Sequence, residues 1–264
     1  NRKTLRTDAR HHEADPRRTV TEHVLDAVRH VCAAVVILEN VPRFATVDGG
    51  VPFRRLCGQL EALGYACESR VLCPTQFNAP HRRPRLYIVA IRRDAMCRDL
   101  VWPDDEPLKR SVHDLLEPDA DPVRHALASE WYRKKLEIDW ALPPDPPRVV
   151  SLATYEFRAR RRAAGKSVRE DANVCPCLTA ADAHYVTHLG RTLTAREALR
   201  LQGFCDALAV PDSITDRGVR RLAGNAMSVD VLMRVLPPAL TAAGLVDAGG
   251  CTNPVRTDGP SCAA

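Results

Sequence analysis

The chain has 264 residues, 45% of them apolar, which is ordinary for a globular protein and enough to bury one large core or two small ones. Its 38 Lys and Arg residues outnumber 33 Asp and Glu residues and give a net charge of +5. Five of the 38 are lysines, which leaves 33 arginines. Arginine suits phosphates and base edges, so this composition favours a polyanionic partner, although the codon bias of a GC-rich genome would explain it equally well.

The ten cysteines are scattered along the chain, which has no hydrophobic leader and no apolar run long enough to cross a membrane. We therefore expect a reduced, intracellular protein without a membrane partner, located in a nucleus or a bacterial cytoplasm. No Cys-x-x-Cys pair occurs, and Cys175-Pro176-Cys177 lacks a second ligand pair, so no metal site is expected. The chain opens on Asn1 and its first methionine is Met96, so we expect a piece of a longer protein.

The first predicted elements are a helix and a strand. Apolar residues recur at helical spacing from Thr19 to Cys32, which predicts an amphipathic helix packed on a sheet. Four apolar residues follow at 35–38, three of them β-branched, and predict a buried strand of a parallel sheet. The strand ends in Glu39 and Asn40, at the edge where open α/β sheets bind ligands. A solvated loop with a helix cap would explain the same pair.

The next elements complete half of an α/β sheet. Residues 51–63 predict a second helix that ends at Gly64, and residues 65–72 predict a strand. A basic loop over 76–85, stiffened by two prolines, leads into a continuous apolar strand over 86–91. No helix separates the last two strands, so they are expected to pair antiparallel.

The regular pattern stops near Arg93. Prolines are frequent from Asp94 to Asn173, and one helix is expected there, over Ser129 to Ile138, so we expect a small, loop-rich domain. A basic run in this segment suits phosphate contacts, and a solvated helix face is an equally good explanation. The run consists of Arg158, Arg160, Arg161 and Arg162.

Regular structure returns at residues 191–204. Thr194 and Glu197 have the spacing of a capping box, at the start of a helix that Gly203 ends. Residues 215–222 predict a short helix.

A glycine turn is predicted at Gly224, and it leads into a last helix over residues 229–243. The free N–H groups at the start of such a helix would form an anion site. The tail from Gly249 is rich in Gly, Pro and Ser and is expected to be disordered.

Four blocks resemble the cytosine-5 methyltransferase family, in the order that the family has them. The first block, Glu39-Asn40-Val41, resembles the Glu-Asn-Val motif, and the second, Pro80 to Arg85, resembles Gln-x-Arg-x-Arg with Arg83 and Arg85 in the arginine positions. The third block, Arg191 to Phe204, matches Arg-x-Leu-Thr-x-Arg-Glu-x-x-Arg-Leu-Gln-Gly-Phe at every fixed position. The fourth, Gly224-Asn225-Ala226, resembles the closing Gly-Asn-Ala block. Four matches in family order are far more specific than one.

The resemblance implies a mechanism and roles for the residues. In the family a cysteine thiolate attacks C6 of a flipped cytosine, C5 takes the methyl group of S-adenosylmethionine, and elimination frees the product. Glu39, with Asn40 beside it, would be the acid that donates to N3 of the ring, and Arg83 and Arg85 would orient the base and the glutamate. Such an acid must hold a proton near neutral pH, which the end of a buried apolar strand favours.

The resemblance also implies the cofactor residues and the partner. Asn225, Ala226 and Ser228 would lie near the methionine end of S-adenosylmethionine. Double-stranded DNA would be the partner, contacted by the basic run and by Arg191 and Arg196.

The chain departs from the family at three places. His81 occupies the glutamine position of the second block. The glycine-rich cofactor loop is absent, and so is the Pro-Cys-Gln loop with the nucleophile. The Pro176-Cys177 pair lies where the family has a Pro-Thr-Leu-Thr-like segment, so we do not assign Cys177 as the nucleophile.

The sequence therefore predicts an α/β fold, part of a Rossmann-like S-adenosylmethionine-dependent methyltransferase sheet, with a small irregular target-recognition domain. The expected segments are 1–93 for the second half of the catalytic domain, 94–190 for target recognition, 191–245 for the return to the catalytic domain and 246–264 for the tail. A second chain or a missing N-terminal segment would supply the absent loops. Two other functions stay open: methylation of tRNA, favoured by a loose Cys-Phe-Thr resemblance at residues 177–179, and a non-catalytic module that binds nucleic acid or a partner.

Overall fold

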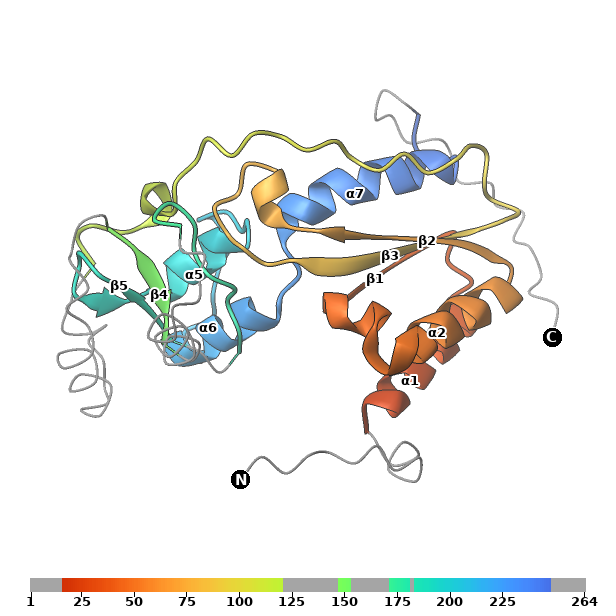
Figure 1. Cartoon of the computed structure of the whole chain (residues 1–264), viewed down its shortest axis with the longest axis horizontal. Helices are drawn as coiled ribbons and strands as arrows, with labels where there is room; N and C mark the ends of the chain where they lie inside the picture. The colour runs from red at the N-terminus through yellow and green to blue at the C-terminus, as the bar shows by residue number, and fades with distance from the viewer. Residues whose placement is uncertain (1–15, 121–146, 153–170, 181–182, 248–264) are drawn as a thin grey trace. The chain divides into compact units, whose positions relative to one another are not determined.

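The computed structural model describes residues 16–120, 147–152, 171–180 and 183–247 (Figure 1). The chain divides into two compact units. The first consists of residues 1–71, 85–102 and 236–264, and the second of residues 72–84 and 103–235. The predicted helix at 129–138, the basic run at 158–162 and the tail from 248 lie outside the described residues.

The first unit is built on three strands. They are β1 (Val35–Asn40), β2 (Tyr65–Leu72) and β3 (Arg85–Arg92), in the order β1-β3-β2. The helices α1 (Pro16–Val31) and α2 (Val51–Ala62) lie on one face of this sheet (Figure 1). All these elements were predicted from the sequence.

Strand β3 forms the centre of the sheet. Residues 86–91 are each no more than 3% exposed, as a strand with two neighbours requires. Leu86, Ile88 and Ala90 pack with Leu25 of α1 and Leu60 of α2 in one apolar core. The alternation of these three residues places them on the same face of the strand.

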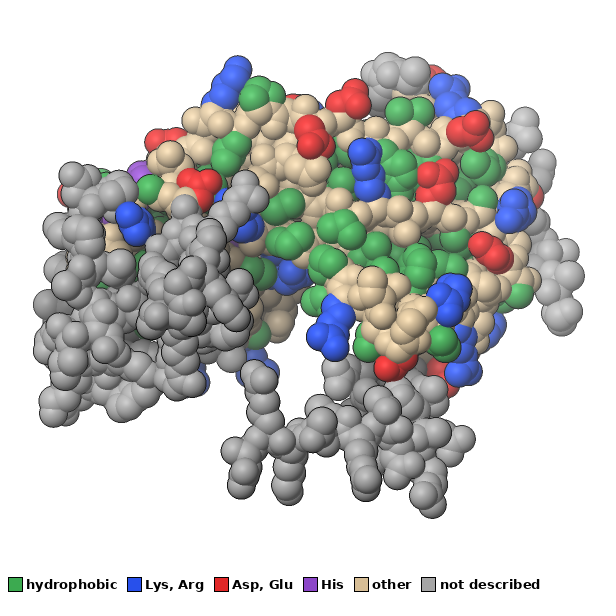
Figure 2. Space-filling view, in the orientation of Figure 1, with side chains coloured by type: hydrophobic (Ala, Val, Ile, Leu, Met, Phe, Trp, Pro, Cys, Tyr) green, Lys and Arg blue, Asp and Glu red, His purple; other side chains and the backbone are tan. Residues whose placement is uncertain are grey.

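The expectation for β1 was wrong in two respects. It pairs antiparallel with β3, with Val35 opposite Ile91 and Asn40 opposite Leu86, and is not part of a parallel pair. All six of its residues are half-buried. The reason is that β3 is its single neighbour among the described residues, so β1 is an edge strand, and hydrophobic side chains reach the surface over it (Figure 2).

Short 3-10 helices connect the elements. They are η2 (Pro42–Ala45) and η3 (Val47–Gly50) in the first unit, and η4 (Pro74–Gln76) and η5 (Val112–Leu115) in the second. Gly50 has a φ of +80°, and a Cβ there would lie 2.7 Å from the carbonyl oxygen of Ala45, so this turn requires glycine.

The second unit contains a small antiparallel sheet that the sequence did not predict. Its strands are β4 (Val149–Ser151), β5 (His184–Val186) and β6 (Arg191–Thr192), in the order β4-β5-β6. Strands of two or three residues are too short to show the alternation on which such a prediction depends.

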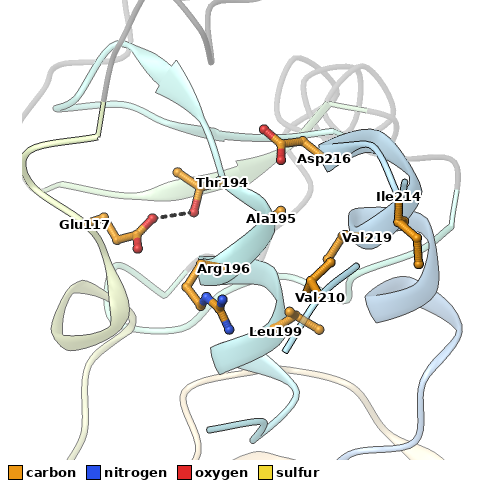
Figure 3. Close-up of a pocket in the computed structure, with 9 residues that line it drawn as sticks. All are labelled: Glu117, Thr194, Ala195, Arg196, Leu199, Val210, Ile214, Asp216 and Val219. Carbon is orange, nitrogen blue, oxygen red and sulfur yellow. Dashed lines mark hydrogen bonds between the residues drawn. The ribbon is translucent and has the colours of Figure 1, made fainter. Parts of the chain in front are cut away.

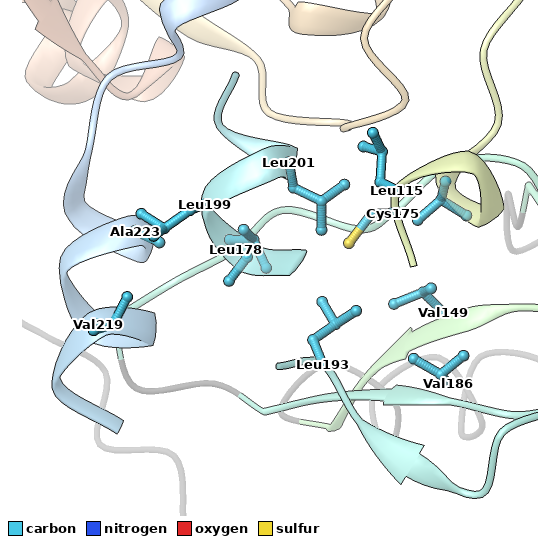
Figure 4. Close-up of a cluster of buried hydrophobic side chains, with 12 residues drawn as sticks. Leu115, Val149, Cys175, Leu178, Val186, Leu193, Leu199, Leu201, Val219 and Ala223 are labelled. Atoms are coloured by element: carbon cyan, nitrogen blue, oxygen red, sulfur yellow. The ribbon is translucent and has the colours of Figure 1, made fainter. Parts of the chain in front are cut away.

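Two helices cover the core of the second unit, α5 (Ala195–Leu201) and α6 (Asp216–Asn225) (Figure 4). The capping box at the start of α5 is confirmed, because the Thr194 hydroxyl accepts from the Glu197 N–H at 3.0 Å and the Glu197 carboxylate accepts from the Thr194 N–H at 2.7 Å. Leu199 and Leu201 face the core with Val186, Leu193 and others. A last helix, α7 (Val229–Ala242), follows.

The predicted glycine turn at Gly224 was wrong. Gly224 lies inside α6, which extends through Asn225, and Ala226 is the residue that caps its end. A Cβ on Gly224 would lie 2.6 Å from the Thr179 carbonyl oxygen and 2.6 Å from the Ala180 nitrogen. Glycine is required here for close approach to another segment, and the glycine turn on which the anion site was predicted is replaced by the last turn of α6.

No helix in the described ranges is both long enough and apolar enough to cross a membrane.

Candidate active site

Glu39 and Asn40 lie at the carboxyl end of β1, as predicted. The Asn40 side-chain oxygen accepts a hydrogen bond from the Val41 N–H at 2.8 Å, so this amide fixes the turn after the strand. Glu39 stands opposite Tyr87 in the antiparallel register, which brings it close to the start of β3.

Arg85, the first residue of β3, forms an ion pair with Glu39. Its Nε lies 3.4 Å from Glu39 Oε1, and the two side chains are 14% and 16% exposed. The expectation that Arg85 orients the glutamate agrees with this contact. The expectation that Glu39 holds a proton near neutral pH stays a prediction.

Arg83 belongs to the second unit and holds backbone carbonyls. It is 3% exposed, and its two terminal nitrogens donate to the Leu178 carbonyl at 2.7 Å and the Ala226 carbonyl at 2.9 Å. These charge-assisted bonds fix residue 178 and the end of α6 against the basic loop. Arg83 thus positions the Gly-Asn-Ala block.

The contacts of His81 show why a histidine can replace the glutamine of the family motif. It is fully buried, and its Nε2 accepts a hydrogen bond from the Leu178 N–H at 3.1 Å. An accepting Nε2 carries no proton, so the hydrogen-bonding function of a glutamine oxygen is kept. The loop is also tied by the N–H of Cys175 to the Pro80 carbonyl at 2.8 Å and by the N–H of Arg82 to the Cys175 carbonyl at 2.9 Å.

Cys177 is half-buried beside this loop. Its Sγ lies 3.8 Å from a terminal nitrogen of Arg83 and 3.4 Å from the Leu178 carbonyl oxygen. Its assignment as a residue other than the nucleophile stays a prediction.

The predicted cofactor residues lie at the junction of α6 and α7. Asn225 is exposed at the end of α6, and Ala226 uses its carbonyl for Arg83. Ser228 is 1% exposed, and its hydroxyl has no hydrogen-bond partner among the described residues. A buried, unsatisfied hydroxyl is costly, so this site fits a polar ligand group.

The prediction that Arg191 contacts nucleic acid is corrected by its burial. Arg191 is 1% exposed, and its terminal nitrogens donate to the Glu197 carboxylate at 2.7 and 3.0 Å. A further bond reaches the Glu117 carbonyl at 2.6 Å. Because these donors are engaged in the interior, Arg191 links residue 117 with β6 and α5, and its guanidinium is not exposed to a phosphate in the described structure. Arg196 is half-buried and donates to the Leu208 carbonyl at 3.1 Å.

Sequence reasoning did not find a cavity of about 230 Å³ beside α5 (Figure 3). Glu117 lines it, and its Oε2 accepts from the Thr194 hydroxyl at 2.7 Å. The other polar lining residues are Arg196 and Asp216, and the walls include Leu199 and Val219. Glu117 lies 77 residues from Thr194, and no local pattern connects the two.

A comparison with known families decides the relationship. Residues 7–237 match the model of the C-5 cytosine-specific DNA methylases. This chain belongs to that family. The match contains all four blocks that the sequence singled out.

Relatives and solved structures agree with the assignment. The chain is 30% identical over 226 residues to the type II methyltransferase M.NgoBI of Neisseria gonorrhoeae, which covers 83% of this chain and 64% of that protein. It is 25% identical over 245 residues to the tRNA (cytosine(38)-C(5))-methyltransferase of Schizosaccharomyces pombe, covering 83% and 68%. The chain spans just under two thirds of the length of the bacterial relatives M.NgoBI, M.Bsp6I and M.HaeII.

The fold is that of the same enzymes. The crystal structure of S. pombe Dnmt2 methyltransferase superposes with a TM-score of 0.56 at 22% identity, over 83% of this chain and 71% of that one. A putative prophage DNA modification methyltransferase from E. coli gives 0.54 at 18% identity, over 87% and 75%. The chain is therefore an α/β protein with part of the Rossmann-like methyltransferase sheet, as predicted.

Proposed function

We propose that this chain carries the cytosine-binding residues, and part of the cofactor site, of a DNA cytosine-5 methyltransferase. The reaction moves a methyl group from S-adenosylmethionine to C5 of a cytosine flipped out of double-stranded DNA. The observation that carries the proposal is the Glu39–Arg85 pair at the carboxyl end of β1, in a member of the C-5 cytosine-specific DNA methylase family.

Glu39 would donate to N3 of the flipped cytosine when C6 is attacked. Its carboxyl group is partly exposed, so it can meet a base, and Arg85 fixes its orientation. Asn40 would hold the turn that presents Glu39.

S-adenosylmethionine would be bound in part by Asn225, Ala226 and Ser228. The buried Ser228 hydroxyl is free to bond a ligand, and Arg83 fixes the Ala226 backbone next to it. When bound, the cofactor supplies an electrophilic methyl group on sulfur.

We further propose that a second chain or a preceding segment supplies the glycine-rich loop and the Pro-Cys loop with the nucleophile. The 264 residues contain no glycine-rich cofactor loop and no Pro-Cys-Gln motif, and the Pro176-Cys177 pair is not assigned as the nucleophile. The position of β1 supports this proposal, because β1 is an edge strand among the described residues and its apolar residues 35–38 are suited to pairing with another strand. Residues 94–190 are proposed as the target-recognition segment.

Complementation tests the proposal. The chain alone is expected to form no covalent adduct with DNA that contains 5-fluorocytosine. The chain mixed with a partner carrying both loops should form the adduct and transfer methyl groups. Transfer by the 264 residues alone would show that the nucleophile lies within them and would contradict its proposed origin.

The same assay distinguishes DNA methylation from tRNA methylation and from a non-catalytic binding role. Methyl transfer to total tRNA that exceeds transfer to duplex DNA would favour the RNA substrate. Nucleic-acid binding with no transfer in any completed form would favour the non-catalytic module. The expectation of a fully reduced protein disagrees with Cys32, which is disulfide-bonded, and an intracellular location stays a prediction.

A further inference from the structure

The outward face of α6 carries two arginines in a line with Asn225. Arg217, Arg221 and Asn225 are exposed and occupy positions i, i+4 and i+8, which lie on one face of a helix. The opposite face contains Val219 and Ala223, which are buried in the core of the second unit.

Neither arginine has an ion pair or hydrogen bond within the described part of the chain. The positions three and four residues away from each contain no acidic side chain; they are Ser213, Ile214, Gly218, Arg220, Gly224 and Asn225, besides the two arginines themselves. Like charges at i and i+4 repel and destabilise a helix. The fold therefore keeps two cations adjacent without an internal partner for them.

A third arginine adds to the same local charge. Arg220 is half-buried between the two, and its guanidinium donates to the Leu193 carbonyl at 3.5 Å. Burial lowers the pKa of Arg220, and the positive charge of Arg217 lowers it further, while Asp216 acts in the opposite direction. Arg217 and Arg220 therefore repel each other in the folded protein, and the negative charge of Asp216 partly offsets this repulsion.

We propose that Arg217 and Arg221 bind backbone phosphates of double-stranded DNA. The choice of DNA as the polyanion rests on the proposed function. One turn of the helix separates the two residues by about 6 Å, and one strand of DNA carries a phosphate per roughly 3.4 Å of axis, so the pair spans about two phosphates. Arginines that contact backbone phosphates position DNA without reading its sequence.

The location of Arg217 and Arg221 on α6 suits a role in placing DNA near the cofactor site. Asn225 continues the same face one turn further, and it is the residue that the family resemblance places near the cofactor. DNA held along α6 would therefore lie next to Asn225, which is proposed to bind the cofactor, and the two arginines would set the register of the DNA.

The salt dependence of DNA binding tests the proposal on the full 264-residue chain. The variant R217Q/R221Q is compared with R55Q/R98Q, which removes two exposed arginines of the first unit and changes the net charge equally. Fluorescence anisotropy with a duplex of arbitrary sequence gives the slope of log K against log salt concentration. Loss of two phosphate contacts should make the slope of R217Q/R221Q shallower by about 1.8, while R55Q/R98Q keeps the wild-type slope.

A lysine variant and a folding control complete the experiment. R217K/R221K should retain the slope, because a lysine also neutralises a phosphate, and unfolding curves confirm that each variant folds. Equal slope changes in both glutamine variants, no change in either, or tighter arginine-dependent binding to tRNA than to duplex DNA would overturn the proposal. The readout needs no methyl transfer, so a failure of the proposed chemistry leaves this result independent.

Discussion

Two arginine–glutamate pairs of this chain differ in burial and in geometry. The pair Arg191–Glu197 is about 1% exposed, and both carboxylate oxygens are engaged at 2.7 and 3.0 Å. The side chains of the pair Arg85–Glu39 are 14% and 16% exposed and are joined by a longer contact of 3.4 Å. The buried pair is fully engaged in internal hydrogen bonds and holds the fold, whereas the side chains of the Arg85–Glu39 pair are partly exposed.

The largest expected effect comes from breaking the buried pair. Arg191→Met leaves the Glu197 carboxylate buried without its cation, which should lower the free energy of unfolding by about 3–5 kcal/mol, measured by urea titration. The double variant Arg191→Met/Glu197→Leu should recover much of this loss, because neither charge is left alone. A loss below about 1 kcal/mol in the single variant would contradict the structural role of Arg191.

The next effect concerns Gly224, a residue of the last family block. Gly224→Ala forces a methyl group against the Thr179–Ala180 backbone and should cost roughly 1–3 kcal/mol. Gly58→Ala is the matched control, because nothing lies within 4 Å of its would-be Cβ in α2. It should stabilise the chain by up to about 1 kcal/mol, as alanine favours a helix. Equal effects at both sites would mean that α6 does not approach residues 179–180 closely.

A smaller effect should appear in the pH dependence of stability. Burial lowers the pKa of His188 in the folded chain, and His113 and Arg191 lower it further. Below an unfolded pKa of about 6.5 the unfolded chain binds the proton more readily, so this contribution to stability is present above that pH and is lost as the pH falls. Unfolding curves between pH 7.5 and 5.5 should show a weaker decline for His188→Gln than for the wild type. A steeper decline in the variant would reverse the assigned sign.

Features set by residues close together in the sequence, such as the capping box of α5, were predicted correctly. Features set by contacts between residues far apart in the sequence were not. The helix at 195–201 was predicted because its capping partners, Thr194 and Glu197, are three residues apart. The role of Gly224 depends on Thr179, 45 residues earlier, and the role of Arg191 depends on Glu117, 74 residues earlier. No pattern in a single sequence reports such pairs.

The edge position of β1 escaped prediction for the same reason. Its four apolar residues are typical of a buried parallel strand, and only the insertion of β3 between β1 and β2 shows otherwise. The Glu39–Arg85 contact follows from that insertion, because it brings the start of β3 to the end of β1.

The most direct test of the central claim is the rate of methyl transfer by Glu39→Gln in the completed enzyme. The control is Glu22→Gln, an exposed position on α1. We expect Glu39→Gln to lower the single-turnover rate on duplex DNA at least 100-fold, because it removes an acid that acts on the reacting ring, while changing the free energy of unfolding by no more than about 1 kcal/mol. Glu22→Gln should change neither quantity. A rate for Glu39→Gln within about threefold of wild type would contradict the claim that this carboxylate acts on the cytosine.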